Sequence, residues 1–205
     1  MHDLVITGGT VIDGTGAAAF RADIAIDDGV ITEIGTITDP GRTTVDATGL
    51  VVTPGFIDHH THYDGQITWD PVLAPSSTNG VTSVVVGNCG VGFAPVAPGK
   101  QAFLIGLMEG VEDIPGVALT EGVRFDWESF PEYMNSLERT PHSLDFLLQV
   151  PHDPLRMAVM GDRALAHEIA TPADIAAMAR IRTALDPRGT LNPGVLLPPS
   201  AGAGA

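Results

Sequence analysis

Short runs of apolar and β-branched residues alternate with turn dipeptides over the first quarter of the chain. These runs lie at 4–7, 10–12, 23–26 and 30–34, with Gly8-Gly9 and Asp28-Gly29 between members of each pair. Gly-Gly and Asp-Gly supply the positive φ angles that tight hairpin turns require. The pattern therefore predicts about five to seven short antiparallel strands, with a further turn at Pro40-Gly41.

Beyond Pro54-Gly55 the pattern changes to apolar strands separated by segments of helical periodicity. The strand-like runs lie at 56–58, 82–86 and 144–150, and the helical segments at 100–111 and 130–138. Near-continuous apolar runs of this kind are typical of parallel strands buried on both faces, with helices as connections. We expect an α/β barrel or a doubly wound sheet.

A further helix is predicted from Pro172 to about Leu185. Thr171 suits the N-cap, Pro172 the first helical position, and Asp174 places a negative charge in the first turn. The Pro- and Gly-rich residues 186–205 beyond this helix predict an irregular tail.

The composition excludes several classes of protein. Asp and Glu number 25 against 10 Lys and Arg, a formal charge of −15, so we expect no nucleic-acid or membrane-surface partner. The apolar runs fall far short of the roughly 18 residues that a membrane span requires. The first residues also lack the cationic and apolar regions of a secretory signal, so a cytoplasmic location is expected.

Two histidines, His60 and His62, come after the strand-like run 56–58. Alternation along a strand turns both imidazoles to one face, where they could chelate a divalent metal. Alternatively, they are solvated residues at a strand end. Asp58 shares this face and could orient a ligand or cap the strand, whereas His59 is expected to point the other way in a structural role.

Cys89, the single cysteine, comes after the run 82–86 and lies within the sequence GNCG at 87–90. If the two strands are neighbours, its thiolate reaches the same metal, and thiolate ligands suit zinc. A buried inert cysteine is one alternative. A Cys–His nucleophile pair is another, although no separate base motif accompanies it. One cysteine also excludes an intrachain disulfide.

Four segments carry a more specific pattern: LVITGGTVIDG at 4–14, VTPGFID at 52–58 leading into HTH at 60–62, GNCGVGFAP at 87–95 and MEGVEDIPG at 108–116. In these segments the chain resembles the amidohydrolase superfamily, and within it the D-aminoacylase (N-acyl-D-amino-acid deacylase) branch. The resemblance implies an α/β fold with a small β-sandwich segment over 1–53. It also implies a partial (β/α)8 TIM-type barrel over 54–185 and an irregular tail over 186–205.

The resemblance further implies a site and a reaction. His60, His62 and Cys89 would hold zinc, with Cys89 in the place that a carbamylated lysine takes in many superfamily members. The implied reaction is metal-dependent hydrolysis of the amide bond of an N-acyl-D-amino acid, in which the metal lowers the pKa of water. The family's proton-shuttling aspartate and remaining metal histidines belong to barrel strands beyond this chain, so no catalytic residue is expected here.

Two further residues, His152 and Arg156, are expected at the mouth of the third strand and resemble a family segment. Arg156 could pair with a substrate carboxylate, and His152 could face the site. The alternative is a loop arginine in a surface ion pair and a hydrogen-bonded loop histidine.

About three of eight βα units are predicted, which leaves the third strand with an open edge. We therefore expect a hydrolase that is weakly active or inactive alone, or else a non-catalytic remnant or assembly subunit. Homo-oligomers could form through the open barrel edge. Residues 181–194 are also similar to the closing segment of FAD-linked oxidases, but with no flavin-binding domain upstream they imply no flavin.

Overall fold

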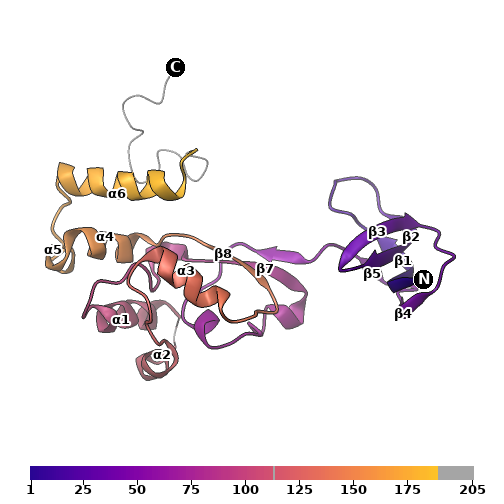
Figure 1. Ribbon diagram of the computed structural model, residues 1–205, viewed down its shortest axis with the longest axis horizontal. Coiled ribbons are helices and arrows are strands. Elements are labelled where there is room, and N and C mark those ends of the chain that lie inside the picture. The colour runs from indigo at the N-terminus through magenta and orange to yellow at the C-terminus, as the bar shows by residue number, and fades with distance from the viewer. Residues whose placement is uncertain (113, 189–205) are drawn as a thin grey trace, which may run out of the picture. The chain divides into compact units, whose positions relative to one another are not determined.

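The computed structural model describes residues 1–112 and 114–188, which fall into two compact units (Figure 1). The first unit is Met1–Phe56 and the second begins at Ile57. Each unit buries apolar residues of its own. None of the helices in the described residues combines the length and hydropathy of a transmembrane span.

The first unit is built on one five-stranded sheet. Its strands are β1 (His2–Val11), β2 (Phe20–Asp27), β3 (Val30–Gly35), β4 (Gly41–Asp46) and β5 (Val51–Val52). β2 pairs antiparallel with both β1 and β3, whereas β4 and β5 pair parallel with β1. The prediction of antiparallel strands throughout is therefore wrong. The reason is that a turn signal such as Pro40-Gly41 determines only a local reversal, and this connection carries the chain to the far side of β1.

The glycines of β1 form a bulge instead of the predicted hairpin. The pairing with β2 shifts register between Ile6 and Gly9. Gly8 has a φ of 67°, and a Cβ at Gly9 would lie 2.6 Å from a methyl group of Val52. The glycines thus permit a bulge and a close approach of strands. By contrast, Asp28-Gly29 makes the predicted turn between β2 and β3.

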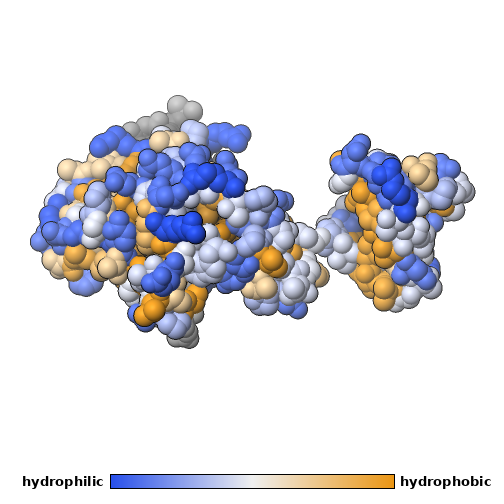
Figure 2. All heavy atoms as spheres, turned by 60° about the horizontal axis from the view of Figure 1, so that its bottom comes forward, coloured by the Kyte–Doolittle hydropathy of each residue, from blue (hydrophilic) through white to orange (hydrophobic). Residues whose placement is uncertain are grey.

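Within the described residues of the first unit the strands form one sheet, and the β-sandwich segment stays a prediction. Figure 2 shows apolar side chains gathered on one face of the first unit. The large apolar residues that stay exposed in the first unit include Phe20, Val30, Ile31, Ile34, Val45 and Val51.

The second unit contains a three-stranded sheet with helices around it, a mixed α/β arrangement (Figure 1). The strands lie in the order β6 (Phe56–Asp58), β7 (Val81–Val86) and β8 (Asp145–Leu148), with β7 parallel to β8. The helices are α1 (Gln101–Glu112), α2 (Gly116–Gly122), α3 (Phe130–Glu138), α4 (His152–Met160), α5 (Asp162–Leu165) and α6 (Pro172–Leu185). Single 3₁₀ turns occur at η1 (Gln66–Thr68), η2 (Ser77–Asn79) and η3 (Asn88–Gly90). The three predicted strands and the helices at 100–111 and 130–138 are confirmed.

An aromatic cluster ties α3 to the segments that carry the site. The indole nitrogen of Trp127 donates to the carbonyl of Phe93 at 2.9 Å, and the Tyr133 hydroxyl donates to the carbonyl of Asp64 at 3.0 Å. The rings of Trp127 and Tyr133 lie 4.8 Å apart between centroids. Because these side chains are buried, the cluster holds the chain after β6 and after β7 against α3.

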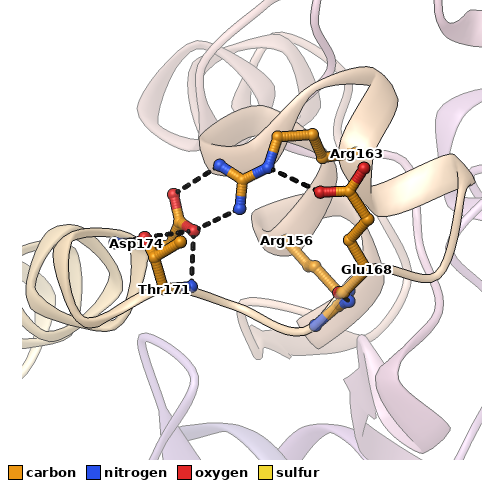
Figure 3. A network of polar contacts seen from close by, with 5 residues as sticks. All are labelled: Arg156, Arg163, Glu168, Thr171 and Asp174. Atoms are coloured by element: carbon orange, nitrogen blue, oxygen red, sulfur yellow. Dashed lines mark hydrogen bonds and ion pairs between the residues drawn. The ribbon is translucent and has the colours of Figure 1, made fainter.

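The helix α6 begins at a polar network that Figure 3 shows in detail. Thr171 and Asp174 form a reciprocal capping box, which confirms the predicted N-cap, and the helix has the predicted bounds. Arg163 pairs with Asp174 at 2.6 Å and with Glu168 at 3.1 Å. The bond from Arg163, together with the weaker effect of those from Thr171, holds the pKa of Asp174 well below its usual range.

Candidate metal centre

Three potential metal ligands converge after the ends of β6 and β7. One ligand atom each of His60, His62 and Cys89 lies within 4.8 Å of the others. Nε2 of His60 is 3.2 Å from Sγ of Cys89, and the two imidazole centroids are 5.5 Å apart. A tetrahedral zinc ion with nitrogen and sulfur ligands separates its ligand atoms by about 3.5 Å. The distance between His60 and Cys89 is close to this separation, and nitrogen and sulfur are donors that zinc favours.

The segment with the two histidines is fixed by the residue between them. The amide and the hydroxyl of Thr61 both donate to the carbonyl of Val85 in β7, at 3.1 and 2.8 Å. Thr61 is buried. This anchoring holds the segment between the two histidines against the end of β7.

The environment of His62 favours a neutral imidazole. Burial lowers its pKa, and the neighbouring His60 lowers it further. Its Nδ1 is buried and has no hydrogen-bond partner among the described residues. Neutral imidazole is the form that binds metals, and a buried ring nitrogen without a partner is costly. Both observations fit a ligand of a cation.

Cys89 lies in a turn whose backbone is largely left-handed. The φ angles are 87° at Gly87, 56° at Cys89 and 80° at Gly90. A non-glycine residue in this region costs of order 1–3 kcal/mol and persists only where surrounding contacts hold it. The Cys89 side chain is exposed, so the alternative of a buried inert cysteine is wrong.

Asp64 is a further buried acidic residue at the site, and it is absent from the residues predicted above. Only 2% of it is exposed, and its Oδ2 has no hydrogen-bond partner in the described residues. Burial raises the pKa of this carboxyl to about 7, against the opposing hydrogen bond from the amide of Gly87. That bond places the carboxyl against the turn that carries Cys89. Asp64 lies two residues after His62, in the same series of alternate positions as His60 and His62. This spacing is the sequence pattern that indicates Asp64 as a candidate site residue.

Asp58 caps the end of its strand, because its Oδ1 accepts a hydrogen bond from the amide of His60 at 3.2 Å. This is one of the two roles left open for it. His59 is exposed and lies outside the cluster of three potential ligands.

His152 and Arg156 lie on α4, not in a loop. His152 is the first residue of the helix, and a Cβ at Gly90 would lie 3.5 Å from that of His152, so it neighbours the Cys89 turn. Arg156 donates a hydrogen bond to the carbonyl of Glu168 (Figure 3). Proline is tolerated in a first helical turn, so Pro154 is compatible with α4. A substrate-binding role for either residue stays a prediction.

Comparison with protein families gives a match to the amidohydrolase family over residues 43–192. This match includes most of the segment that is similar to FAD-linked oxidases, whose residues from 189 onward lie outside the described part. A D-aminoacylase of Alcaligenes xylosoxydans xylosoxydans is 36% identical over 97% of this chain, and the chain spans 39% of that protein. An N-acyl-D-aspartate deacylase of the same organism is 36% identical over 86% of the chain and 33% of its own length.

Solved structures of the same branch are also similar to this chain. An N-acyl-D-glutamate deacylase from Bordetella bronchiseptica, complexed with zinc and a phosphonate inhibitor, has a TM-score of 0.72 and 36% identity, covering 89% of this chain and 36% of that one. A D-aminoacylase crystal structure has a TM-score of 0.70 and 34% identity, covering 88% of this chain and 35% of that one. The chain therefore spans less than two fifths of these structures, and within that length it belongs to the amidohydrolase family.

Proposed function

We propose that this chain supplies the zinc-binding part of a hydrolase that cleaves the amide bond of N-acyl-D-amino acids. The observation that carries the proposal is the convergence of His60, His62 and Cys89 on one point. The substrate class is inferred from similar proteins that are a D-aminoacylase and deacylases of N-acyl-D-aspartate and N-acyl-D-glutamate.

Each part of the site has a separate task. His60, His62 and Cys89 would hold the ion, because two imidazoles and a thiolate are donors that zinc favours. Thr61 holds the segment between the two imidazoles in place through its bonds to Val85. Bound zinc lowers the pKa of water and polarises a carbonyl oxygen, which is the chemistry that amide hydrolysis needs.

Proton transfer to the leaving amine is a task for which this chain offers no assigned residue. General acid and base catalysis typically contributes a factor of about 10² to 10⁴ to a rate. We therefore expect the 205-residue chain to bind zinc while hydrolysing N-acyl-D-amino acids weakly or not at all.

Zinc analysis of purified variants tests the metal site. We expect one zinc ion for each wild-type chain, and strongly reduced zinc in Cys89→Ala and His60→Ala. The matched control is His167→Ala, which removes an exposed histidine outside the cluster and should leave the zinc content unchanged. Equal zinc in wild type and Cys89→Ala would contradict the proposed site.

The substrate class is tested by assaying release of free amino acid from N-acetyl-D-glutamate and N-acetyl-L-glutamate. Any hydrolysis by the chain should be zinc-dependent and confined to the D enantiomer. Hydrolysis that prefers the L enantiomer, or that persists in Cys89→Ala, would refute the assignment.

A further inference from the structure

Asn88 lies at the centre of a hydrogen-bond cluster that joins the ends of three strands. Its Nδ2 donates to the carbonyls of Thr61 and Val85, at 3.0 and 2.8 Å, and its Oδ1 accepts from Nε2 of Gln149 at 2.9 Å. Thr61 comes after β6, Val85 belongs to β7, and Gln149 comes after β8. The side chain is buried, so both of its N–H groups and its oxygen are satisfied by protein groups.

This cluster connects the two parts of the proposed metal site. Asn88 directly precedes Cys89, and Thr61 lies between His60 and His62. The bond from Asn88 to Thr61 therefore links the segment with the thiol to the segment with the imidazoles. The bond to Val85 meets the same carbonyl that anchors Thr61, so both segments are held to one point of β7.

The backbone at Cys89 needs such support. Its φ of 56° and that of Gly90 at 80° are left-handed, and a non-glycine residue in this region persists only where other contacts determine it. Within the turn, the amide of Val91 donates to the carbonyl of Asn88 at 3.1 Å. The buried carboxamide of Asn88 adds a hydrogen bond to each of the three strand ends.

We propose that Asn88 is a positioning residue that holds the thiol of Cys89 at the distance from His60 and His62 that zinc requires. The inference rests on the proposed metal site. It assigns no direct contact between Asn88 and the metal. Outer-shell groups that orient metal ligands typically change metal affinity by about 10-fold to 100-fold when they are removed.

The test compares Asn88→Ala with wild type in the full chain. We expect the Kd for zinc, measured by competition with a chromogenic chelator, to rise by about 10-fold or more. Cobalt(II) provides a spectroscopic readout, because its thiolate charge-transfer band reports the bond to sulfur, and we expect this band to weaken. Because Cys89 is the single cysteine, the protection of thiol alkylation by zinc reports the same bond and should be reduced.

The matched control is Asn79→Ala. Asn79 also donates its side-chain amide to a backbone carbonyl, that of Pro75 at 2.8 Å, but it is exposed and precedes β7. Its zinc affinity and cobalt spectrum should match those of wild type. A purely structural role for Asn88 would lower the melting temperature of Asn88→Ala while leaving the zinc Kd and the cobalt band unchanged, and that result would overturn the inference.

A second variant, Gln149→Ala, covers the case in which Asn88→Ala does not fold. Gln149 is exposed, and its loss leaves the two donor bonds of Asn88 in place, so we expect a rise of the zinc Kd that is measurable but smaller than that in Asn88→Ala. An unchanged Kd in Gln149→Ala would count against the positioning role of Asn88. A wild-type chain that binds no zinc would refute the proposed function and the inference together, whereas normal zinc binding by Asn88→Ala would refute the inference alone.

Discussion

Gly87 is the position at which one added methyl group should disturb the site most. A Cβ there would lie 2.3 Å from the carbonyl oxygen of Gln149, and real Cβ atoms essentially never come within 3.0 Å of a heavy atom outside their own and the neighbouring residues. That segment cannot easily move, because the amide of Gln149 donates to the carbonyl of Val86 at 2.9 Å. The φ of 87° adds the strain of a left-handed residue.

The expected cost of Gly87→Ala combines these two effects. A left-handed alanine costs about 1–2 kcal/mol, and the overlap with packed backbone about 1–3 kcal/mol, so the free energy of unfolding should fall by about 2–5 kcal/mol. At about 4 °C for each kcal/mol, the melting temperature of the second unit should fall by about 8–20 °C. Zinc affinity should fall as well, because Cys89 is two residues away.

Gly99→Ala separates the two effects. Gly99 has a φ of 76°, but a Cβ there meets no atom within 4 Å. This variant should lose only about 1–2 kcal/mol, which differential scanning calorimetry of both variants would measure. Equal melting temperatures for Gly87→Ala and Gly99→Ala would refute the reasoning about the close contact.

Two further predictions concern the first unit and the sheet edge. The hydrogen bond from His2 and those from Thr32 and the amide of Asp3 lower the pKa of Asp27 to about 2. The stabilisation from this carboxylate is therefore present above pH 3.8 and lost as the pH falls towards 2. Asp27→Asn should reduce the acid sensitivity of the first unit, which NMR-monitored titrations would measure. An unchanged titration profile would contradict this prediction. Among the described residues β8 has β7 as its sole strand neighbour, and Leu147 of β8 is 57% exposed. Because an open strand edge can pair with another chain, we expect concentration-dependent self-association in analytical ultracentrifugation, reduced by Leu147→Lys. A monomer at all concentrations would refute this prediction.

The sequence predicts most of the secondary structure of the second unit because the relevant signals are local. The capping box at Thr171 and the Pro at position 172 define the start of α6, and apolar runs define β6, β7 and β8. The helix α4 was not predicted because Pro-His-Asp-Pro is a loop pattern whose helical use depends on the residues after it. The helices α2 and α5 are short and carry no N-cap hydrogen bond from a side chain.

The candidate site likewise combines residues that local sequence patterns select with contacts that only the tertiary structure produces. Alternation in the sequence pairs His60 with His62 and suggests Cys89 as a third ligand, provided that β6 and β7 are neighbours. That condition is a tertiary one, and the structure meets it. The burial of Asp64 and the three bonds of Asn88 depend on strand ends that are distant in the chain, and no local pattern contains them.

By itself, the amino-acid sequence determined the residue types that can bind a metal, the strands and helices with strong local signals, and the turn at Asp28-Gly29. The tertiary structure alone decided that β4 and β5 run parallel to β1, that Gly8-Gly9 is a bulge, and that three ligand atoms lie within 4.8 Å. The physical reason is that hydrogen bonding within a turn or helix involves neighbours in the chain. Pairing of strands and burial of a side chain depend instead on which distant segments arrive beside them.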